Sequence, residues 1–212
     1  MRLLDLFCGA GGCSMGYHRA GFEVVGVDIN PQPHYPFEFH QADALAYPLD
    51  GFDVIHASPP CQAFTPLSKG LGHPNPIPAT RKKLLGKIYV IENVPGAPLQ
   101  NPVRLCGSSF GLDVRRHRLF ESSMELTGSQ CRHELQTPRF FQNDYSRKDR
   151  LSSVVACYGA SRFKGDFDLR KKAMDIDWMD IKELSQAIPP AYTEWIGRQI
   201  MEALTLKQEV LP

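Results

Sequence analysis

Two short motifs carry the side chains with the clearest chemistry. Ser58-Pro59-Pro60-Cys61-Gln62 presents a cysteine directly after two prolines, and Glu92-Asn93-Val94-Pro95 presents a carboxylate further along the chain. A cysteine becomes a nucleophile when it is exposed and its pKa is lowered. The two prolines suit an exposed turn better than a buried structural thiol. A carboxyl group beside such a nucleophile can protonate, or hydrogen-bond, a ring nitrogen.

A third motif, Arg116-His117-Arg118-Leu119-Phe120, alternates basic and other residues on an expected strand. Arg116 and Arg118 would then point to the same face. They could hold a carbonyl oxygen and a phosphate, and supply the positive field that Cys61 needs. A solvated edge strand is the alternative.

A glycine-rich turn runs from Asp5 to Gly12, after an apolar run and before an expected helix. Its glycines let the backbone approach a ligand closely, and a helix N-terminus favours negative charge. Asp28 is expected at the end of the next strand, where a carboxylate can accept hydrogen bonds from ribose hydroxyls. Asp43, at the expected end of a third strand, can accept from an adenine amino group. A helix N-cap is the alternative for each aspartate.

Strands that alternate with helices must position these motifs. We expect strands over 3–7, 22–27, 52–57 and 89–91, and a helix over 15–20 that Gly21 closes. This order predicts a parallel sheet with right-handed crossovers. Ligands of such sheets bind at the carboxyl ends of the strands, where all these polar motifs fall. Residues 62–80 are rich in glycine and proline, and we expect them to form a loop that closes over the site.

Composition sets the broad class. The 212 residues are 42% hydrophobic and 22% charged, and no apolar stretch approaches a membrane span, so an intracellular globular protein is expected. Residues 1–60 carry two basic residues against seven acids, whereas residues 132–172 carry ten against five. The basic second part fits a phosphate backbone or a solvated loop equally well.

The six cysteines are irregularly spaced, without a CxxC pair, and we expect free thiols and no metal. Cys131 and His133, with Cys157 further on, could supply three zinc ligands. The alternative is a surface turn plus a core cysteine.

The ordered series DLFCGAGG, VGVDINP, QADAL, SPPCQ, ENV, RRHRLF and SQAIPPAYTEWIG resembles the C5-cytosine DNA methyltransferase family. The resemblance covers residues 3–120 and again about 174–200. It implies a Rossmann-like class I S-adenosylmethionine-dependent methyltransferase fold. In this α/β fold a mixed, mostly parallel sheet has helices on both faces. It also implies double-stranded DNA as the partner and the cytoplasm of a prokaryotic or phage-infected cell as the location.

The resemblance further implies roles for individual residues. Cys61 would add to C6 of a flipped cytosine, Glu92 would bond N3 and the exocyclic amine, and Arg118 with Arg116 would support the base. Asp28 would hold the ribose of S-adenosylmethionine and Asp43 its adenine. The remaining residues expected at the cofactor are Phe7, Cys8, Gly9, Gly11, Gly12, Ile29, Ala44, Pro59 and Gln186.

The chain departs from the family pattern at several points. Val114 and Arg115 precede the Arg-x-Arg where a glutamine is usual, and Ser185-Gln186 replaces a Gly-Asn. We expect a catalytic core over 1–121, a reduced target-recognition segment over 122–173 and a return to the core over 174–212. So short a segment predicts a recognition site on the order of two to four base pairs. We expect the protein to be a monomer.

The candidates for contacts to the DNA backbone are Arg139, Arg147, Lys148 and Arg150.

Three other functions remain open from the sequence. An RNA-directed enzyme keeps the same core motifs. A catalytically inactive nucleic-acid-binding subunit is disfavoured by the intact Cys61, Glu92 and Arg118. An enzyme acting on free nucleotides would explain the reduced segment, but the basic charge of 132–172 disfavours it. Protection in a restriction system and modification of a phage genome are both compatible with the motifs.

Overall fold

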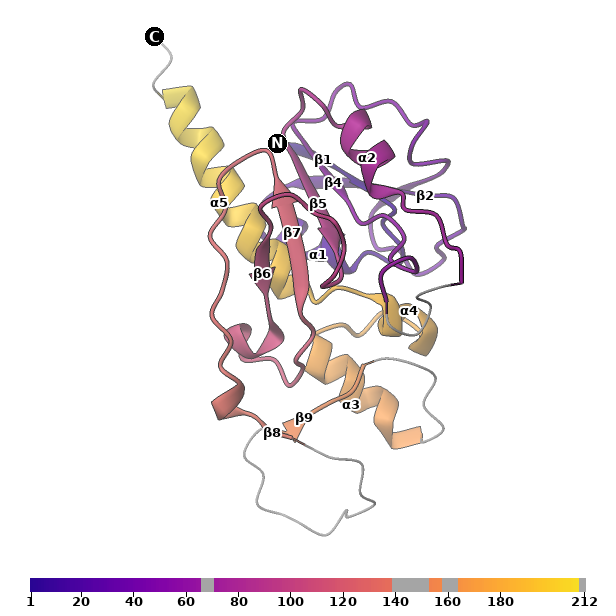
Figure 1. Ribbon diagram of the computed structural model, residues 1–212, viewed down its shortest axis with the longest axis vertical. Helices are drawn as coiled ribbons and strands as arrows, with labels where there is room; N and C mark the ends of the chain where they lie inside the picture. Colours follow the sequence, from indigo (N-terminus) through magenta and orange to yellow (C-terminus); the bar gives the residue numbers. More distant parts are fainter. Residues whose placement is uncertain (66–70, 139–152, 158–163, 210–212) are drawn as a thin grey trace.

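The computed structural model describes residues 1–65, 71–138, 153–157 and 164–209. In this part of the chain, a seven-stranded sheet has the order β3-β2-β1-β4-β5-β7-β6 (Figure 1). Its strands are β1 (Arg2–Leu6), β2 (Glu23–Asp28), β3 (Glu38–Gln41), β4 (Val54–Ala57), β5 (Tyr89–Asn93), β6 (Val103–Leu105) and β7 (Arg118–Ser122). The first five pair in parallel, and β7 pairs antiparallel with both β5 and β6.

The helices are α1 (Gly12–Arg19), α2 (Ile77–Lys83), α3 (Lys164–Met174), α4 (Ile181–Gln186) and α5 (Pro190–Glu209). Short 3-10 turns follow β6 (η1, Gly107–Phe110) and β7 (η2, His133–Leu135), and β8 (Thr137–Pro138) pairs in parallel with β9 (Ser153–Val154). None of the helices in these described ranges is long and apolar enough to cross a membrane.

Alternation along the strands divides the core between the two faces of the sheet. Leu3, Val24 and Val54 point to the face covered by α1 and α5, where Tyr17, Tyr192 and Ile196 join them. Their neighbours point to the other face, against Ala44 and Leu84. A third cluster packs α4 and the end of α3 beneath the glycine turn. The mixed α/β architecture expected from the sequence is therefore confirmed.

Glycines face the contact between helices α1 and α5 and let the two backbones approach each other. A Cβ on Gly16 would collide with Thr193 and the backbone of Pro190, and one on Gly197 would lie 2.7 Å from Ala20. The hydroxyl of Thr193 donates to the carbonyl of Cys13 at 2.8 Å. The C-terminal helix is thus fixed against the helix that follows the glycine turn (Figure 1).

The expected strands are confirmed to within two residues, but two local expectations are wrong. Residues 62–80 are not loop throughout, because α2 begins at Ile77 with Pro78 in its first turn, a position that proline tolerates well. Strand β7 begins only at Arg118, so Arg116 precedes the strand rather than sharing its face. The helix after the glycine turn starts at Gly12, earlier than expected, and Gly21 follows its end with a φ of 101°.

Candidate active site

A cavity of about 970 Å³ opens where the strands β1, β2, β4 and β5 end. The glycine turn, Asp28, the Pro-Pro-Cys turn and Glu92 all line it, as the parallel topology predicts. The approach to β7 and the residues after α4 close the other side. Ligand sites typically enclose about 300–1,000 Å³, so this cavity has room for a substrate group and a cofactor together.

Hydrogen bonds hold the Pro-Pro-Cys turn on both sides. The amide of Ser58 donates to the carbonyl of Leu6 at 3.1 Å, which continues the pairing of β4 with β1. The side-chain amide of Asn93 donates to the carbonyl of Pro59 at 2.9 Å. The second residue of the Glu-Asn pair therefore braces the turn that presents Cys61, while the first faces the cavity.

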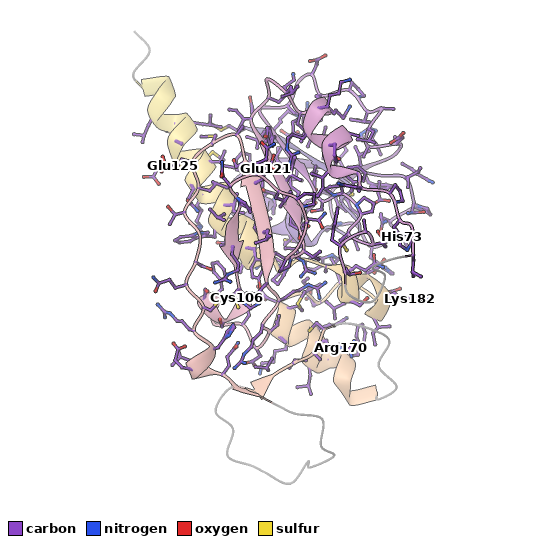
Figure 2. The ribbon with its side chains drawn as sticks, viewed as in Figure 1. His73, Cys106, Glu121, Glu125, Arg170 and Lys182 are labelled. Atoms are coloured by element: carbon purple, nitrogen blue, oxygen red, sulfur yellow. The ribbon has the colours of Figure 1, made fainter. Side chains whose placement is uncertain are left out.

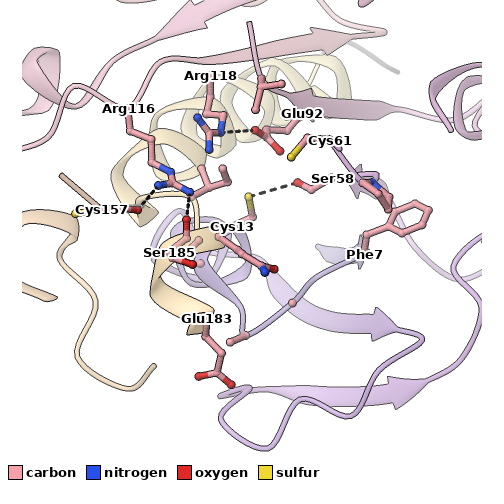
Figure 3. Close-up of a pocket in the computed structure, with 18 of the residues that line it drawn as sticks. Phe7, Cys13, Ser58, Cys61, Glu92, Arg116, Arg118, Cys157, Glu183 and Ser185 are labelled. Atoms are coloured by element: carbon pink, nitrogen blue, oxygen red, sulfur yellow. Dashed lines mark hydrogen bonds and ion pairs between the residues drawn. The ribbon is translucent and has the colours of Figure 1, made fainter. Parts of the chain in front are cut away.

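Cys61 is half-buried in the cavity wall, and its thiol points toward Glu92 and Arg118 (Figure 3). Burial and the nearby Glu92 carboxylate raise the pKa of Cys61, whereas Arg118 and Arg116 lower it by a smaller amount. The expectation of a lowered pKa is therefore wrong for the protein without substrate. Burial therefore favours the neutral thiol of Cys61 over the thiolate.

Glu92 and Arg118 form a buried ion pair at 3.1 Å (Figure 3). Only 5% of Glu92 is exposed, and burial raises its pKa, against the opposing effects of Arg118, the Ser58 hydroxyl and Arg116. A carboxyl group with a raised pKa retains a proton more readily than an exposed one. Glu92 is therefore suited to hydrogen-bond or protonate a ring nitrogen in the cavity.

Behind Glu92 runs a chain of buried polar groups that sequence reasoning missed. The Ser58 hydroxyl lies 2.9 Å from Nε2 of His56, and Nδ1 of His56 lies 2.9 Å from the Tyr17 hydroxyl. Burial lowers the pKa of His56 to about 3, so the ring is neutral. A histidine three residues before the first proline, in an otherwise apolar strand, was the available signal.

Arg116 lines the cavity, but its guanidinium is bound by backbone carbonyls of the protein. Its guanidinium donates to the carbonyls of Cys157 at 2.8 Å and Ser185 at 2.7 Å (Figure 3). The Tyr192 hydroxyl in turn donates to the carbonyl of Arg116. Burial and the neighbouring Arg118 lower the pKa of Arg116 to about 10, which leaves it charged. These contacts join four distant segments, so Arg116 positions the wall of the cavity.

The other end of the cavity begins at the glycine turn. Phe7 and Gly9 have φ values of 58° and 50°, and a Cβ on Gly9 would meet open space. The Asp28 carboxylate accepts from the amides of Gly9 at 3.1 Å and Asn30 at 2.9 Å, and Ile29 beside it is 66% exposed. A backbone open to close approach, a carboxylate at a strand end and two apolar side chains fit a nucleoside-containing cofactor such as S-adenosylmethionine.

Twelve of the predicted site residues line this cavity, and three do not. Those that line it are Phe7, Cys8, Gly9, Gly12, Asp28, Ile29, Pro59, Cys61, Glu92, Arg116, Arg118 and Gln186. Gly11, Asp43 and Ala44 lie outside the lining, and their contact with a cofactor stays a prediction. Asp43 caps its own turn by accepting from the amide of Leu45 at 2.8 Å, and Ala44 is buried in the core.

Two further predictions concern the second half of the chain. The candidates for DNA-backbone contacts, Arg139, Arg147, Lys148 and Arg150, lie outside the described residues. The C-terminal segment does return to the glycine turn, since the Trp178 indole donates to the carbonyl of Ala10 at 2.8 Å. Ser185 and Gln186, at the site of the departure from the family pattern, both reach the cavity.

The whole fold corresponds to that of known methyltransferases. An E. coli prophage protein, crystallised as a candidate DNA modification methyltransferase, superposes with a TM-score of 0.67 at 13% identity. The match covers 97% of this chain and 99% of that one. The sheet, the crossovers and the long C-terminal helix thus define a methyltransferase-type α/β fold.

The particular family follows from sequence comparison. The family described as "C-5 cytosine-specific DNA methylase" matches residues 1–96. The type II methyltransferase M.HgiGI of Herpetosiphon aurantiacus is 33% identical over 93 residues, covering 35% of this chain and 73% of that protein. M.AquIA of a Picosynechococcus strain is 29% identical over 122 residues, covering 45% of this chain. The chain belongs to the C-5 cytosine-specific DNA methylase family, and it spans about half (49%) of the length of M.AquIA.

Proposed function

We propose that the protein transfers a methyl group from S-adenosylmethionine to C5 of cytosine in double-stranded DNA. One observation carries the proposal. A single cavity holds Cys61 beside the Glu92–Arg118 pair at one end, and the glycine turn with Asp28 at the other. The proposed nucleophile and proton donor therefore share one cavity with the residues proposed to hold the methyl donor. The family relationship supplies the substrate class.

The residues of the chain act on the base as follows. The Cys61 thiol loses its proton to solvent, and its sulfur forms a bond to C6. Glu92 in its protonated form hydrogen-bonds N3, so the electron pair displaced from the C5–C6 bond accumulates at C5. S-adenosylmethionine, when bound, supplies the electrophilic methyl group. The C5 proton then passes to solvent, its bonding electrons re-form the C5–C6 double bond, and the C6–S bond breaks to release the Cys61 thiolate.

The proposal requires a flipped base, because Cys61 forms part of a cavity wall. A nucleotide inside a duplex keeps C6 stacked between its neighbours, so the target has to leave the helix. The basic residues of 132–172 support backbone contacts, with binding that weakens steeply as salt rises. We further propose that the protein recognises a short DNA sequence. We place its activity in a prokaryotic or phage-infected cell.

Trapping of the covalent adduct tests it. A duplex with 5-fluorocytosine at the target should hold the protein irreversibly when labelled S-adenosylmethionine is present, because fluorine is not lost from C5 as a proton is. Cys61→Ser should give no adduct, whereas Cys13→Ser, a second thiol of the same cavity, should retain it.

The same assay separates the other functions. Labelled methyl groups on RNA or on free cytidine nucleotides, with none on DNA, would contradict the proposal. So would an adduct that survives Cys61→Ser and disappears with Cys13→Ser. Mass spectrometry of a random DNA pool after reaction, followed by bisulfite sequencing, gives the methylated position and the recognition site.

A further inference from the structure

A second cluster of reactive side chains lies beyond β6, outside the chemistry proposed above. Cys106 follows the carboxyl end of β6, and His117 immediately precedes β7. His133 begins η2, and Cys131 lies two residues before it. One potential ligand atom from each of these four residues lies within 4.8 Å of all the others. Figure 2 labels Cys106 at this end of the sheet. Distant parts of the sequence thus converge on one point.

Two of the distances within the cluster join a sulfur to a nitrogen. Sγ of Cys106 lies 3.2 Å from Nε2 of His133, and Sγ of Cys131 lies 3.2 Å from Nε2 of His117. A tetrahedral zinc ion has bonds of about 2.3 Å to sulfur and about 2.0–2.1 Å to nitrogen, which places its ligand atoms about 3.3–3.8 Å apart. Taken alone, each distance also fits a thiol–imidazole hydrogen bond. Two separate hydrogen bonds would not require all four atoms to converge, whereas a shared metal ion does.

We propose that Cys106, His117, Cys131 and His133 bind one zinc ion in a closed structural site. Two thiolates and two imidazoles in tetrahedral arrangement are the ligand set that zinc prefers. Binding releases the two thiol protons, and the resulting charges of the thiolates balance that of the ion. All four positions are filled by protein, so the ion has no open position for catalysis.

The surroundings of the cluster are built to hold these ligands in place. The Ser108 hydroxyl accepts from the amide of Arg132 at 3.0 Å, between Cys131 and His133. The guanidinium of Arg115 donates to the carbonyls of His133 and Gln136, each at 2.9 Å. Cys106 is fully buried and the other three ligands are half-buried. The site therefore joins the segment after β7 to the β6–β7 pair.

An ion at this location would also help to position two arginines of the cavity. His117 stands between Arg116, which supports the cavity wall, and Arg118, which pairs with Glu92. Fixing the imidazole of His117 fixes the backbone from which both guanidinium groups extend. The proposed site differs from the expectation of no metal and from the alternative set Cys131, His133 and Cys157. Cys157 belongs to the buried cluster beneath the glycine turn, and Cys106 with His117 takes its place.

Metal content of the full-length protein tests the proposal without reference to activity. Protein purified without chelator, or offered zinc after reduction, should contain about one zinc ion per chain. Cys131→Ser and His133→Asn should each lower the zinc content at least about tenfold, consistent with loss of one of four ligands. Cys157→Ser and His40→Asn, which alter a cysteine and a histidine outside the cluster, should leave it unchanged.

Measurements on the wild-type protein test the proposal even where a variant fails to fold. Cobalt(II) exchanged into the wild-type protein should give the intense visible bands of a tetrahedral ion and sulfur-to-metal charge transfer. Zinc removed by chelation should lower the melting temperature reversibly, and added zinc should restore it. A reduced wild-type protein that takes up less than about a tenth of an equivalent of zinc would overturn the proposal. Full zinc retention in folded Cys131→Ser protein, or an octahedral cobalt spectrum, would do the same.

Discussion

The parallel and antiparallel halves of the sheet contribute to the cavity in different ways. In the parallel half, β1, β2, β4 and β5 each end in a short motif whose functional side chain lies within a few residues of the strand. In the antiparallel half, the residues before β7 reach their positions through partners far along the chain. Arg115 is held by 133–136, and Arg116 is held by Cys157 and Ser185.

The side chains of the two halves are held in position by different interactions. Parallel strands place their carboxyl ends at one edge, so hydrogen bonding within the sheet is enough to bring Cys61 and Glu92 together. The approach to β7 is not paired in the sheet, and its backbone has to be fixed by side chains. Substitutions in the parallel half should therefore affect the reaction rate. Substitutions in the antiparallel half should affect both the free energy of unfolding and the reaction rate.

The largest expected effect is that of Glu92→Gln in the parallel half. Removing the acid should slow methyl transfer in a single turnover by roughly 10²–10⁴-fold, the usual contribution of a general acid or base, with cofactor affinity nearly unchanged. Glu121→Gln is the matched control. Glu121 forms an ion pair with Arg81 at 2.7 Å, and it does not line the cavity. Rapid-quench kinetics with labelled cofactor give the rate. Equal rates for wild type and Glu92→Gln would remove Glu92 from the mechanism.

Arg116→Met probes the antiparallel half. The change leaves the carbonyls of Cys157 and Ser185 without their charged donor, and hydrogen bonds to charged groups contribute about 1.5–3 kcal/mol each. We expect the free energy of unfolding to fall by about 2–5 kcal/mol, together with loss of activity. Arg198→Met, which removes an exposed pair with Glu194 in α5, should cost less than about 1 kcal/mol. Urea denaturation of both variants provides the measurement, and equal losses would contradict the assigned role.

Asp5 and His56, register partners in β1 and β4, should show opposite effects of pH on stability. Burial raises the pKa of Asp5 from 3.8 to about 7, so the folded state holds a proton that the unfolded state releases. Its contribution to stability falls as pH rises from about 4 to about 7, by at most about 1.4 kcal/mol per pH unit. Burial lowers the pKa of His56 from 6.5 to about 3, and its contribution falls as pH drops through that window.

Asp5→Asn separates these two effects. The variant keeps a hydrogen-bonding side chain but no longer titrates, so only the His56 effect remains. Its free energy of unfolding should rise more steeply with pH between about 4 and 6.5 than that of the wild type, where the two slopes oppose each other. Denaturation curves at a series of pH values test this. Identical slopes would show that Asp5 is ionised in the folded protein.

Asn93→Ala should have the smallest effect. It removes the 2.9 Å bond to the carbonyl of Pro59, and a typical hydrogen bond contributes about 0.5–1.5 kcal/mol. The Cys61 turn should loosen, with a modest loss of rate and of adduct yield. Asn75→Ala, which removes a bond of similar length to the amide of Ile77 at the start of α2, is the control for a loss of stability alone. A rate loss as large as that of Glu92→Gln would assign Asn93 a direct part in the chemistry.

The sequence by itself determined the strands, the motifs at their ends and the family, because these features are local. Apolar runs followed by glycine, aspartate or Pro-Pro-Cys specify a strand and what it presents, and parallel topology then places the ends together. The same local reasoning placed Arg116 in a strand and left residues 77–80 as loop, since neither the unpaired approach to β7 nor the packing of α2 can be read from periodicity.

Only the tertiary structure decided how the groups act on one another. Burial together with Glu92 outweighs Arg116 and Arg118 at Cys61, so the pKa of the thiol is raised although these two arginines were expected to lower it. The convergence of Cys106, His117, Cys131 and His133 depends on how the segment after β7 folds back on the β6–β7 pair. Distances between residues far apart in the chain, and the loss of water around them, are properties of the packed molecule and not of any single motif.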